Sequence, residues 1–253
     1  MLKNPFLVNL EKIEYVISYA CTGKCKHCSE GDHENCIDHI DAKTASQAVE
    51  KIASIYDIKT VMTFGGEPLL FPETVYEIIS AAKRMNIPKR QVITNGYFST
   101  NVDVIKSVSQ KLSESGVNDL LLSVDAFHQE TIPLDTVKIF AKELQKCSVP
   151  IRLQPAWLVS RDNDNPYNKK TREILDSFKY MEIYENDGNI VFPEGNAKKY
   201  LSEYFLSDVP DNPYVEDPLD VKCISFSPNG DVLDSNIYRE DITTITKNYT
   251  PKR

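Results

Sequence analysis

Short apolar segments alternate with amphipathic helical patterns along most of this 253-residue chain. The segments that we interpret as strands are 13–19, 59–64, 90–94, 119–124, 151–158 and 181–184. The helical patterns between them span 41–56, 72–85, 102–115, 134–147 and 169–180, with Asp41 as a cap of the first. Such alternation predicts βαβ units, an α/β fold class and a parallel sheet. It is compatible with a partial (β/α)6 barrel and equally with an open, doubly wound sheet.

Three cysteines follow the first predicted strand in a C-x3-C-x2-C spacing: Cys21, Cys25 and Cys28. Three thiolates on one loop can hold three irons of a [4Fe–4S] cluster and leave the fourth iron open for a ligand. A structural zinc site is the alternative, because zinc there binds four nitrogen or sulfur ligands. The residues that could complete it are His27, His33 and Cys36.

Glycine and polar residues stand at the ends of the next predicted strands, where a parallel barrel binds its ligands. They are Gly65, Gly66, Glu67 and Pro68 after the second strand, Thr94 and Asn95 after the third, and Ser123 and Asp125 after the fourth. On the fifth strand, we expect one of Arg152 and Gln154 to face the interior and the other to face the helices. The alternative for Thr94 and Asn95 is an ordinary turn at a strand end.

The cysteine spacing, together with Gly65-Gly66-Glu67-Pro68, resembles the radical S-adenosylmethionine (radical SAM) enzymes over residues 12–186. The resemblance implies a partial (β/α)6 barrel, which we place at residues 1–187, with a [4Fe–4S] cluster on the three cysteines. The open iron would bind S-adenosylmethionine (SAM). One electron would then cleave SAM to methionine and a 5′-deoxyadenosyl radical, which abstracts a substrate hydrogen. A flavodoxin- or ferredoxin-type reductant and an anaerobic setting are expected.

The same resemblance implies which residues contact SAM. The motif at 65–68 would hold the methionine amino group, and Gln154 would meet the carboxylate. His27 stands where relatives carry an aromatic ring near the adenine, or it is a solvated loop residue. The residues expected along the ribose and methionine are Thr94, Asn95, Ser123 and Asp125.

Three residues are candidates for substrate chemistry. His128, beside Phe127, lies after the fourth strand and could reach over the barrel mouth, although a structural hydrogen bond is the alternative. Asp125 supplies a carboxylate close by in sequence. Cys223 could donate a hydrogen atom to a substrate radical, or it is a packed thiol.

Residues 188–253 change in character, and we expect a small C-terminal cap. A helix at 197–205 and a Pro/Asp-rich loop at 208–219 precede a hairpin that starts at Cys223 and turns at Asn229-Gly230. The Cys223 segment resembles the start of the SPASM or twitch extension of radical SAM peptide-modifying enzymes. Residues 232–253 contain no cysteine, which argues against a second cluster.

The C-terminal resemblance favours a peptide or ribosomally made natural product as substrate. A small molecule is the close alternative, because only about a dozen residues precede the first strand and leave no room for a peptide-recognition domain. A glycyl-radical activating enzyme is a third option. A structural zinc protein or an electron-transfer iron–sulfur protein would need neither Glu67 nor polar residues at the ends of four strands.

Composition limits the classes of partner and the cellular compartment that we expect for this chain. A formal net charge of −8 argues against nucleic acid and against an anionic membrane surface. We find no signal peptide or membrane span in the sequence and expect a cytoplasmic protein. Six cysteines, three of them clustered, suit metal binding in a reducing compartment.

Overall fold

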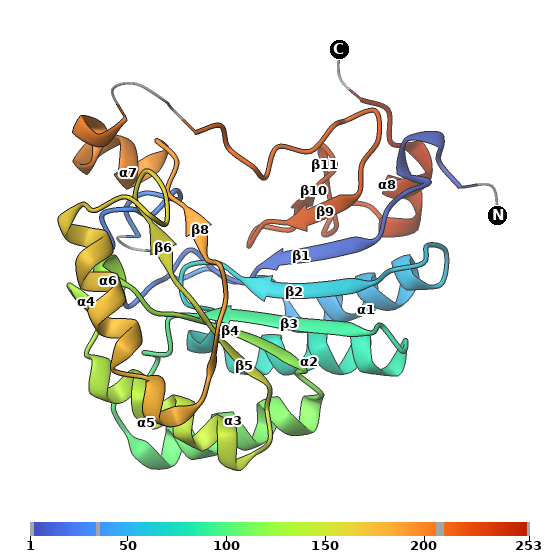
Figure 1. The fold of residues 1–253 in the computed structure, drawn as a ribbon. Helices are drawn as coiled ribbons and strands as arrows, with labels where there is room; N and C mark the ends of the chain where they lie inside the picture. Colours follow the sequence, from blue (N-terminus) through green and yellow to red (C-terminus); the bar gives the residue numbers. More distant parts are fainter. Residues whose placement is uncertain (1–2, 34–35, 206–209, 252–253) are drawn as a thin grey trace.

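The computed structural model describes residues 3–33, 36–205 and 210–251. Its centre is a parallel sheet of seven strands in the order β7-β5-β4-β3-β2-β1-β9 (Figure 1). The strands are β1 (Lys12–Val16), β2 (Thr60–Phe64), β3 (Lys89–Thr94), β4 (Asp119–Ser123), β5 (Ile151–Gln154), β7 (Tyr184–Glu185) and β9 (Cys223–Phe226). The predicted α/β class and parallel sheet are confirmed.

Four helices pack in sequence order along one face of this sheet (Figure 1). They are α1 (Ala42–Ala53), α2 (Pro72–Arg84), α3 (Val102–Ser115) and α5 (Leu134–Lys146). Each buries an apolar stripe against the strands, and Asp41 caps α1 as predicted by accepting the Thr44 N–H at 2.8 Å. A doubly wound sheet carries helices on both faces, whereas these four helices cover one face of a curved sheet, as in a partial barrel. The doubly wound alternative is therefore wrong.

Shorter elements gather at the carboxyl ends of the strands, on the left in Figure 1. They are α4 (Ala126–Gln129), α6 (Pro166–Asp176), α7 (Gly195–Tyr200) and the parallel pair β6 (Ala156–Trp157) and β8 (Asn189–Ile190). Single 3-10 turns occur at Pro5–Leu7, Pro68–Leu70, Lys179–Met181 and Ser202–Tyr204. Within the described part of the chain, no helix has both the length and the apolar character needed to cross a membrane.

Three predicted boundaries in the second half of the barrel are wrong. The predicted strand 151–158 is divided into β5 and β6 at Pro155, which has no N–H to continue the ladder. Helix α6 begins earlier than expected, because Asn165 caps it by accepting the Asn168 N–H at 2.9 Å. Met181 lies in a 3-10 turn, so the sixth strand is only β7.

The C-terminal segment pairs differently from the predicted hairpin. β9 runs parallel to β1, with Cys223 opposite Lys12, and Phe226 stacks on Tyr15 with ring centroids 4.6 Å apart. The hairpin is instead β10 (Asp231–Val232) with β11 (Ser235–Asn236), and its turn residues Leu233 and Asp234 have positive φ. The expected helix at 197–205 is the shorter α7 and a 3-10 turn, and α8 (Ile242–Asn248) was not predicted.

Candidate functional site

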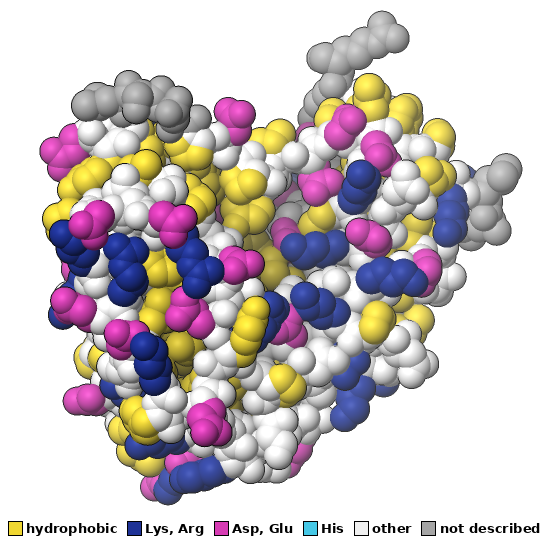
Figure 2. Space-filling model, in the orientation of Figure 1, with side chains coloured by type: hydrophobic (Ala, Val, Ile, Leu, Met, Phe, Trp, Pro, Cys, Tyr) yellow, Lys and Arg dark blue, Asp and Glu magenta, His cyan; other side chains and the backbone are white. Residues whose placement is uncertain are grey.

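A cavity of about 510 Å³ lies at the carboxyl ends of the strands, within the range of small-molecule sites. The molecule is hollowed between the α7 region and the β9–β11 region, with hydrophobic side chains visible in the hollow (Figure 2). The structure brings most of the predicted site residues onto this one wall. They are Cys21, Cys25, His27, Cys28, Gly65, Gly66, Thr94, Asn95, Ser123, Asp125, His128 and Gln154.

The three cysteines are free thiols, and N–H groups are directed at the sulfurs of Cys21 and Cys28. Cys21 Sγ accepts from the Gly23 N–H at 3.3 Å and from Asn95 Nδ2 at 3.7 Å. Burial raises the pKa of Cys21 to about 11 and also raises the pKa values of Cys25 and Cys28. Iron would hold all three as thiolates, and N–H donors to sulfur are a usual feature of iron–sulfur sites. The donor set therefore fits a [4Fe–4S] cluster.

Gly65 and Gly66 bring the loop after β2 against the segment that leads to Cys21. The Gly66 N–H donates to Ser18 O and the Glu67 N–H to Ala20 O, both at 2.8 Å. A Cβ on Gly66 would lie 2.2 Å from Ala20 O, closer than atoms can approach. The space that a side chain of Gly66 would need is occupied by the Ala20 backbone, so only glycine lets these two loops of the site touch.

Glu67 lies behind the cavity wall rather than on it, as does Pro68. The Glu67 carboxylate accepts hydrogen bonds from Leu69 N at 3.0 Å, Thr94 Oγ1 at 2.7 Å and Asn95 N at 2.8 Å. Burial raises the pKa of Glu67 to about 7, although these three donors oppose the shift. Glu67 thus fixes the end of β3 and, through it, the amide that contacts Cys21.

Asp125 and His128 form a buried pair beside the cysteine loop. Asp125 Oδ2 lies 2.8 Å from His128 Nδ1 and accepts the Ala156 N–H at 3.0 Å. Burial opposes ionisation of Asp125, but the charge and hydrogen bonds of His128 outweigh it and hold the pKa at about 2. The His128 ring is therefore fixed in the cavity wall.

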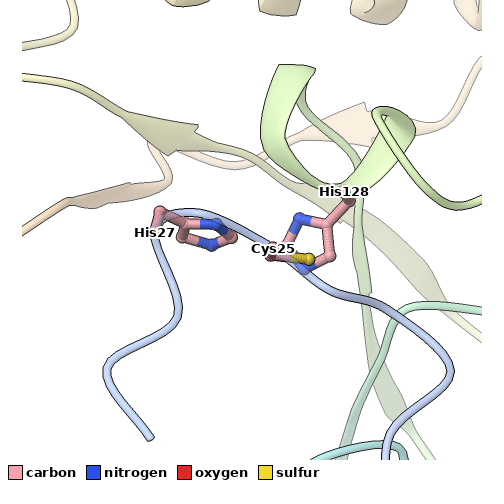
Figure 3. Close-up of side chains that lie close together, drawn as sticks. All are labelled: Cys25, His27 and His128. Carbon is pink, nitrogen blue, oxygen red and sulfur yellow. The ribbon is translucent and has the colours of Figure 1, made fainter. Parts of the chain in front are cut away.

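Cys25, His27 and His128 approach one another where α4 meets the cysteine loop, and their possible ligand atoms lie within 4.8 Å (Figure 3). Burial lowers the pKa of His27 to about 4, so this ring is neutral at pH 7. It packs against Phe127 with centroids 4.8 Å apart, and its Nδ1 has no hydrogen-bond partner among the described residues. His27 is thus a packed ring of the wall rather than a solvated loop residue.

Ser123 and Gln154 stand side by side at the ends of β4 and β5. Both line the cavity and are 9% exposed. The expectation that Arg152 and Gln154 face opposite ways is wrong, because residues two apart on a strand share a face. Arg152 lies deeper in the barrel and binds Asp119 through two hydrogen bonds of 2.8 and 2.7 Å.

Asn196, at the start of α7, supports the cysteine loop and was not predicted. Its backbone N–H donates to Cys28 O at 2.8 Å, and its Nδ2 donates to Cys25 O at 3.3 Å. His33 also contacts this loop, with Nε2 3.2 Å from Cys28 Sγ and Nδ1 2.6 Å from Tyr19 O. A single Asn in an irregular segment has no sequence signal, whereas His33 stood close enough to the cysteines to be considered.

Cys223 is a predicted site residue that does not line this cavity. It lies at the amino end of β9, and the cysteine loop follows the carboxyl end of the neighbouring strand β1. Cys223 lines a second cavity of about 450 Å³, and burial raises the pKa of its thiol. The two cavities share Glu14, Tyr214 and Ser225 on their walls.

Comparison with known proteins identifies one matching family model, that of the radical SAM superfamily, over residues 15–154. Among curated proteins, a probable GTP 3′,8-cyclase of Saccharolobus islandicus (strain L.S.2.15 / Lassen #1) is 27% identical over 186 residues, covering 71% of this chain and 54% of the relative. The chain thus spans about half the length of the curated relatives that it matches.

Two solved structures share the fold at low sequence identity. Streptococcus suis SuiB bound to S-adenosylmethionine superposes with a TM-score of 0.62 at 14% identity, covering 95% of this chain and 66% of SuiB. Native anSMEcpe with bound AdoMet and Cp18Cys peptide gives a TM-score of 0.57 at 14% identity, covering 92% of this chain and 75% of anSMEcpe. At this identity the two superpositions show a shared fold.

Proposed function

The chain belongs to the radical SAM superfamily of enzymes, and on this premise we propose that it abstracts a hydrogen atom from a peptide substrate. The observation that carries the proposal is the single cavity onto which the cysteine loop and the ends of β2 to β5 converge. A structural zinc protein or an electron-transfer protein would have no use for such a cavity beside its metal.

In this proposal, Cys21, Cys25 and Cys28 hold the [4Fe–4S] cluster. When bound, the cluster and SAM supply a 5′-deoxyadenosyl radical for hydrogen abstraction. The chain contributes binding, orientation and exclusion of water. Gly66 and Glu67 hold the cysteine loop against the end of β3, so the thiols and the Asn95 amide keep one geometry.

Further side chains of the cavity wall would position SAM and substrate. The neutral His27 ring, packed on Phe127, offers an apolar surface for the adenine. His128, held by Asp125, presents its remaining ring nitrogen to whatever occupies the cavity. We assign the hydrogen-abstraction region to the part of the cavity wall around His128, which adjoins the cysteine loop.

The charged residues of the cavity wall limit the chemical class of the substrate. Four carboxylates line the cavity, on Glu14, Glu30, Asp125 and Glu194, and no Lys or Arg of residues 3–33, 36–205 or 210–251 does so. Proteins bind triphosphates with Arg, Lys or metal ions. The wall therefore supports a substrate without phosphate groups, unlike the one in the name of the cyclase relatives. A peptide without phosphate groups meets this condition, and a peptide is bound in one of the superposed structures.

The reaction class can be tested after anaerobic reconstitution with iron and sulfide. Dithionite-reduced protein should convert SAM to 5′-deoxyadenosine, measured by liquid chromatography. Cys25→Ala should abolish this product and the iron–sulfur absorbance, because one of three ligands is lost. Cys147→Ala is the matched control, since this free thiol is at the end of α5, away from the cavity, and the variant should retain both signals. Wild-type protein that binds iron but leaves SAM intact would refute the proposal.

The substrate class needs a separate experiment. GTP with Mg²⁺ and a pooled library of synthetic peptides should each be added to the reduced, SAM-loaded enzyme. We expect the peptide pool to increase 5′-deoxyadenosine formation and GTP to leave it unchanged. A GTP-dependent increase, with GTP retained in equilibrium dialysis, would transfer the proposal to a small-molecule enzyme.

A further inference from the structure

A chain of polar side chains crosses the barrel interior beneath the cavity and ends at Gln154. Asp119 binds Arg152 through two hydrogen bonds and accepts a third from Gln91 Nε2 at 2.6 Å. Arg152 Nη1 donates to Asn186 Oδ1 at 3.4 Å, and Asn186 Nδ2 donates to Gln154 Oε1. The backbone N–H of Asn186 is itself held by Leu153 O at 2.9 Å.

This arrangement fixes which atom each amide presents. The guanidinium of Arg152 has only donors, so the Asn186 atom that faces it is the oxygen. The Asn186 nitrogen must then face Gln154, which accepts its hydrogen bond through Oε1. The two remaining N–H groups of Gln154, on Nε2, are left to face the cavity that this side chain lines.

Two donors on the cavity wall therefore stand together without a partner among the described residues. Gln154 Nε2 and the Ser123 hydroxyl make no hydrogen bond to any residue in the described part of the chain, although both side chains are 9% exposed. A few convergent polar groups on the wall of a cavity fix the orientation of the ligand that it binds, and this adjacent pair is free to do so. Donors on both residues call for an acceptor, and a carboxylate binds such donors most strongly.

We propose that Asn186 is a positioning residue, which holds the Gln154 amide so that Gln154 and Ser123 donate to the carboxylate of SAM. The inference rests on the proposed function, because it assumes that SAM occupies this cavity. Asn186 lies outside every motif of the sequence, in the segment between β7 and β8. It acts on the ligand only through Gln154.

The test is Asn186→Asp, which keeps the size of the side chain and offers oxygen on both sides. The new carboxylate would accept from Arg152 and from Gln154 Nε2, so the Gln154 amide would turn and present its oxygen to the cavity. Equilibrium dialysis with reconstituted protein should then show a Kd for SAM about ten- to a hundredfold higher, because charge-assisted hydrogen bonds are lost. The Kd for decarboxylated SAM should not change, because that probe lacks the carboxylate.

Two further variants control for folding and charge. Asn101→Asp adds the same charge at the cap of α3, where Asp serves as well as Asn, and should bind SAM as wild type does. Asn186→Ala frees the amide without turning it, so its Kd for SAM should lie between those of wild type and Asn186→Asp. This ordering gives a second test if Asn186→Asp folds poorly.

The outcomes separate the two proposals. Wild-type protein that binds neither SAM nor decarboxylated SAM would refute the proposed function and this inference with it. Wild-type binding with an unchanged Kd in Asn186→Asp would overturn only the role of Asn186. Equal weakening of both probes would also overturn it, because the effect would then not involve the carboxylate.

Discussion

At the scale of single residues, the site depends on backbone contacts between loops. Gly66 is the clearest case, because its Cα faces the Ala20 carbonyl and leaves no room for a methyl group. We expect Gly66→Ala to separate the two loops and to prevent retention of the cluster, measured as iron per protein after reconstitution and desalting. Gly116→Ala is the control: it strains the left-handed cap of α3, at about 1–2 kcal/mol, but its nearest contacts are atoms of the Lys83 side chain and it does not line the cavity. Full iron retention in Gly66→Ala would show that the loops are not coupled.

Glu67 gives a second prediction at this scale, because all three of its neighbours donate hydrogen bonds. At pH 5 both oxygens of the protonated Glu67 carboxyl group can still accept hydrogen bonds, whereas the amide nitrogen of Glu67→Gln cannot, which should cost about 1–3 kcal/mol of unfolding free energy. Urea unfolding at pH 5 measures this loss. Glu77→Gln, on the exposed side of α2, is the control and should unfold as wild type does.

The same substitution has a pH dependence of defined sign. Burial raises the pKa of Glu67 from 4.5 in the unfolded chain to about 7 in the fold. Its stabilising contribution is therefore complete below pH 4.5 and is lost as the pH rises through 7. Glutamine does not ionise, so the stability gap between wild type and Glu67→Gln should narrow between pH 5 and pH 8. A gap that widens over this range would mean that the three donors outweigh burial.

At the scale of secondary-structure elements, Asp119 connects three neighbouring strands. Its carboxylate binds Gln91 on β3 and Arg152 on β5, and Lys89 lies 3.3 Å away. We expect Asp119→Asn to lower the unfolding free energy by about 1–2 kcal/mol, because Arg152, whose side chain is 27% exposed, loses its charged partner. Asp103→Asn removes a fully exposed pair on α3 and should cause no measurable change.

Lowering the pH should reduce the difference in stability between wild type and Asp119→Asn. Burial opposes ionisation of Asp119, but the hydrogen bonds from Arg152 and Gln91 outweigh it and lower the pKa of the carboxyl group. Its contribution is present above the ordinary pKa of 3.8 and is lost as the pH falls through the lowered value. The stability gap measured by urea unfolding should therefore shrink from pH 6 to pH 3, and a constant gap would contradict the assignment.

The elements that could be predicted are those with a local pattern. The helix from Pro72 to Arg84 repeats apolar residues at helical spacing, and the strands before Gly65 and Asn95 are short apolar runs followed by turn residues. Position on a parallel sheet then predicted which residues would share the cavity. The pairing of β9 with β1 could not be predicted, because it joins residues that are remote in sequence and leaves no periodic signal.

Single polar residues in irregular segments were also beyond prediction. Asn186 and Asn196 are ordinary loop residues in the sequence, and only the fold brings them to Gln154 and to the cysteine loop. Cys223 shows the opposite case. Its residue type suggested chemistry, but Cys223 lies at the amino end of β9, whereas the site lies at the carboxyl ends of the strands.

At the scale of the whole molecule, the C-terminal strand should unfold together with the barrel. Phe226 and Tyr15 are both fully buried and stack across β9 and β1. Phe226→Ala should therefore lower the unfolding free energy by about 3–5 kcal/mol in a single transition, measured by calorimetry and circular dichroism. Tyr184→Ala, on the exposed face of the opposite edge strand, should stay within about 0.5 kcal/mol. Two separate transitions would show that residues around β9 form an independent unit.

The pairing of β9 with β1 also has a consequence for biosynthesis. Ribosomes add about 5–20 residues per second, so β1 waits on the order of ten seconds or more before β9 is made. During that interval one edge of β1 stays open to pairing with other chains, and the adjacent cysteine loop is open to oxidants and to iron–sulfur carriers. Growth temperature, oxygen and the supply of iron and sulfide during translation should therefore govern how much of the protein is recovered intact.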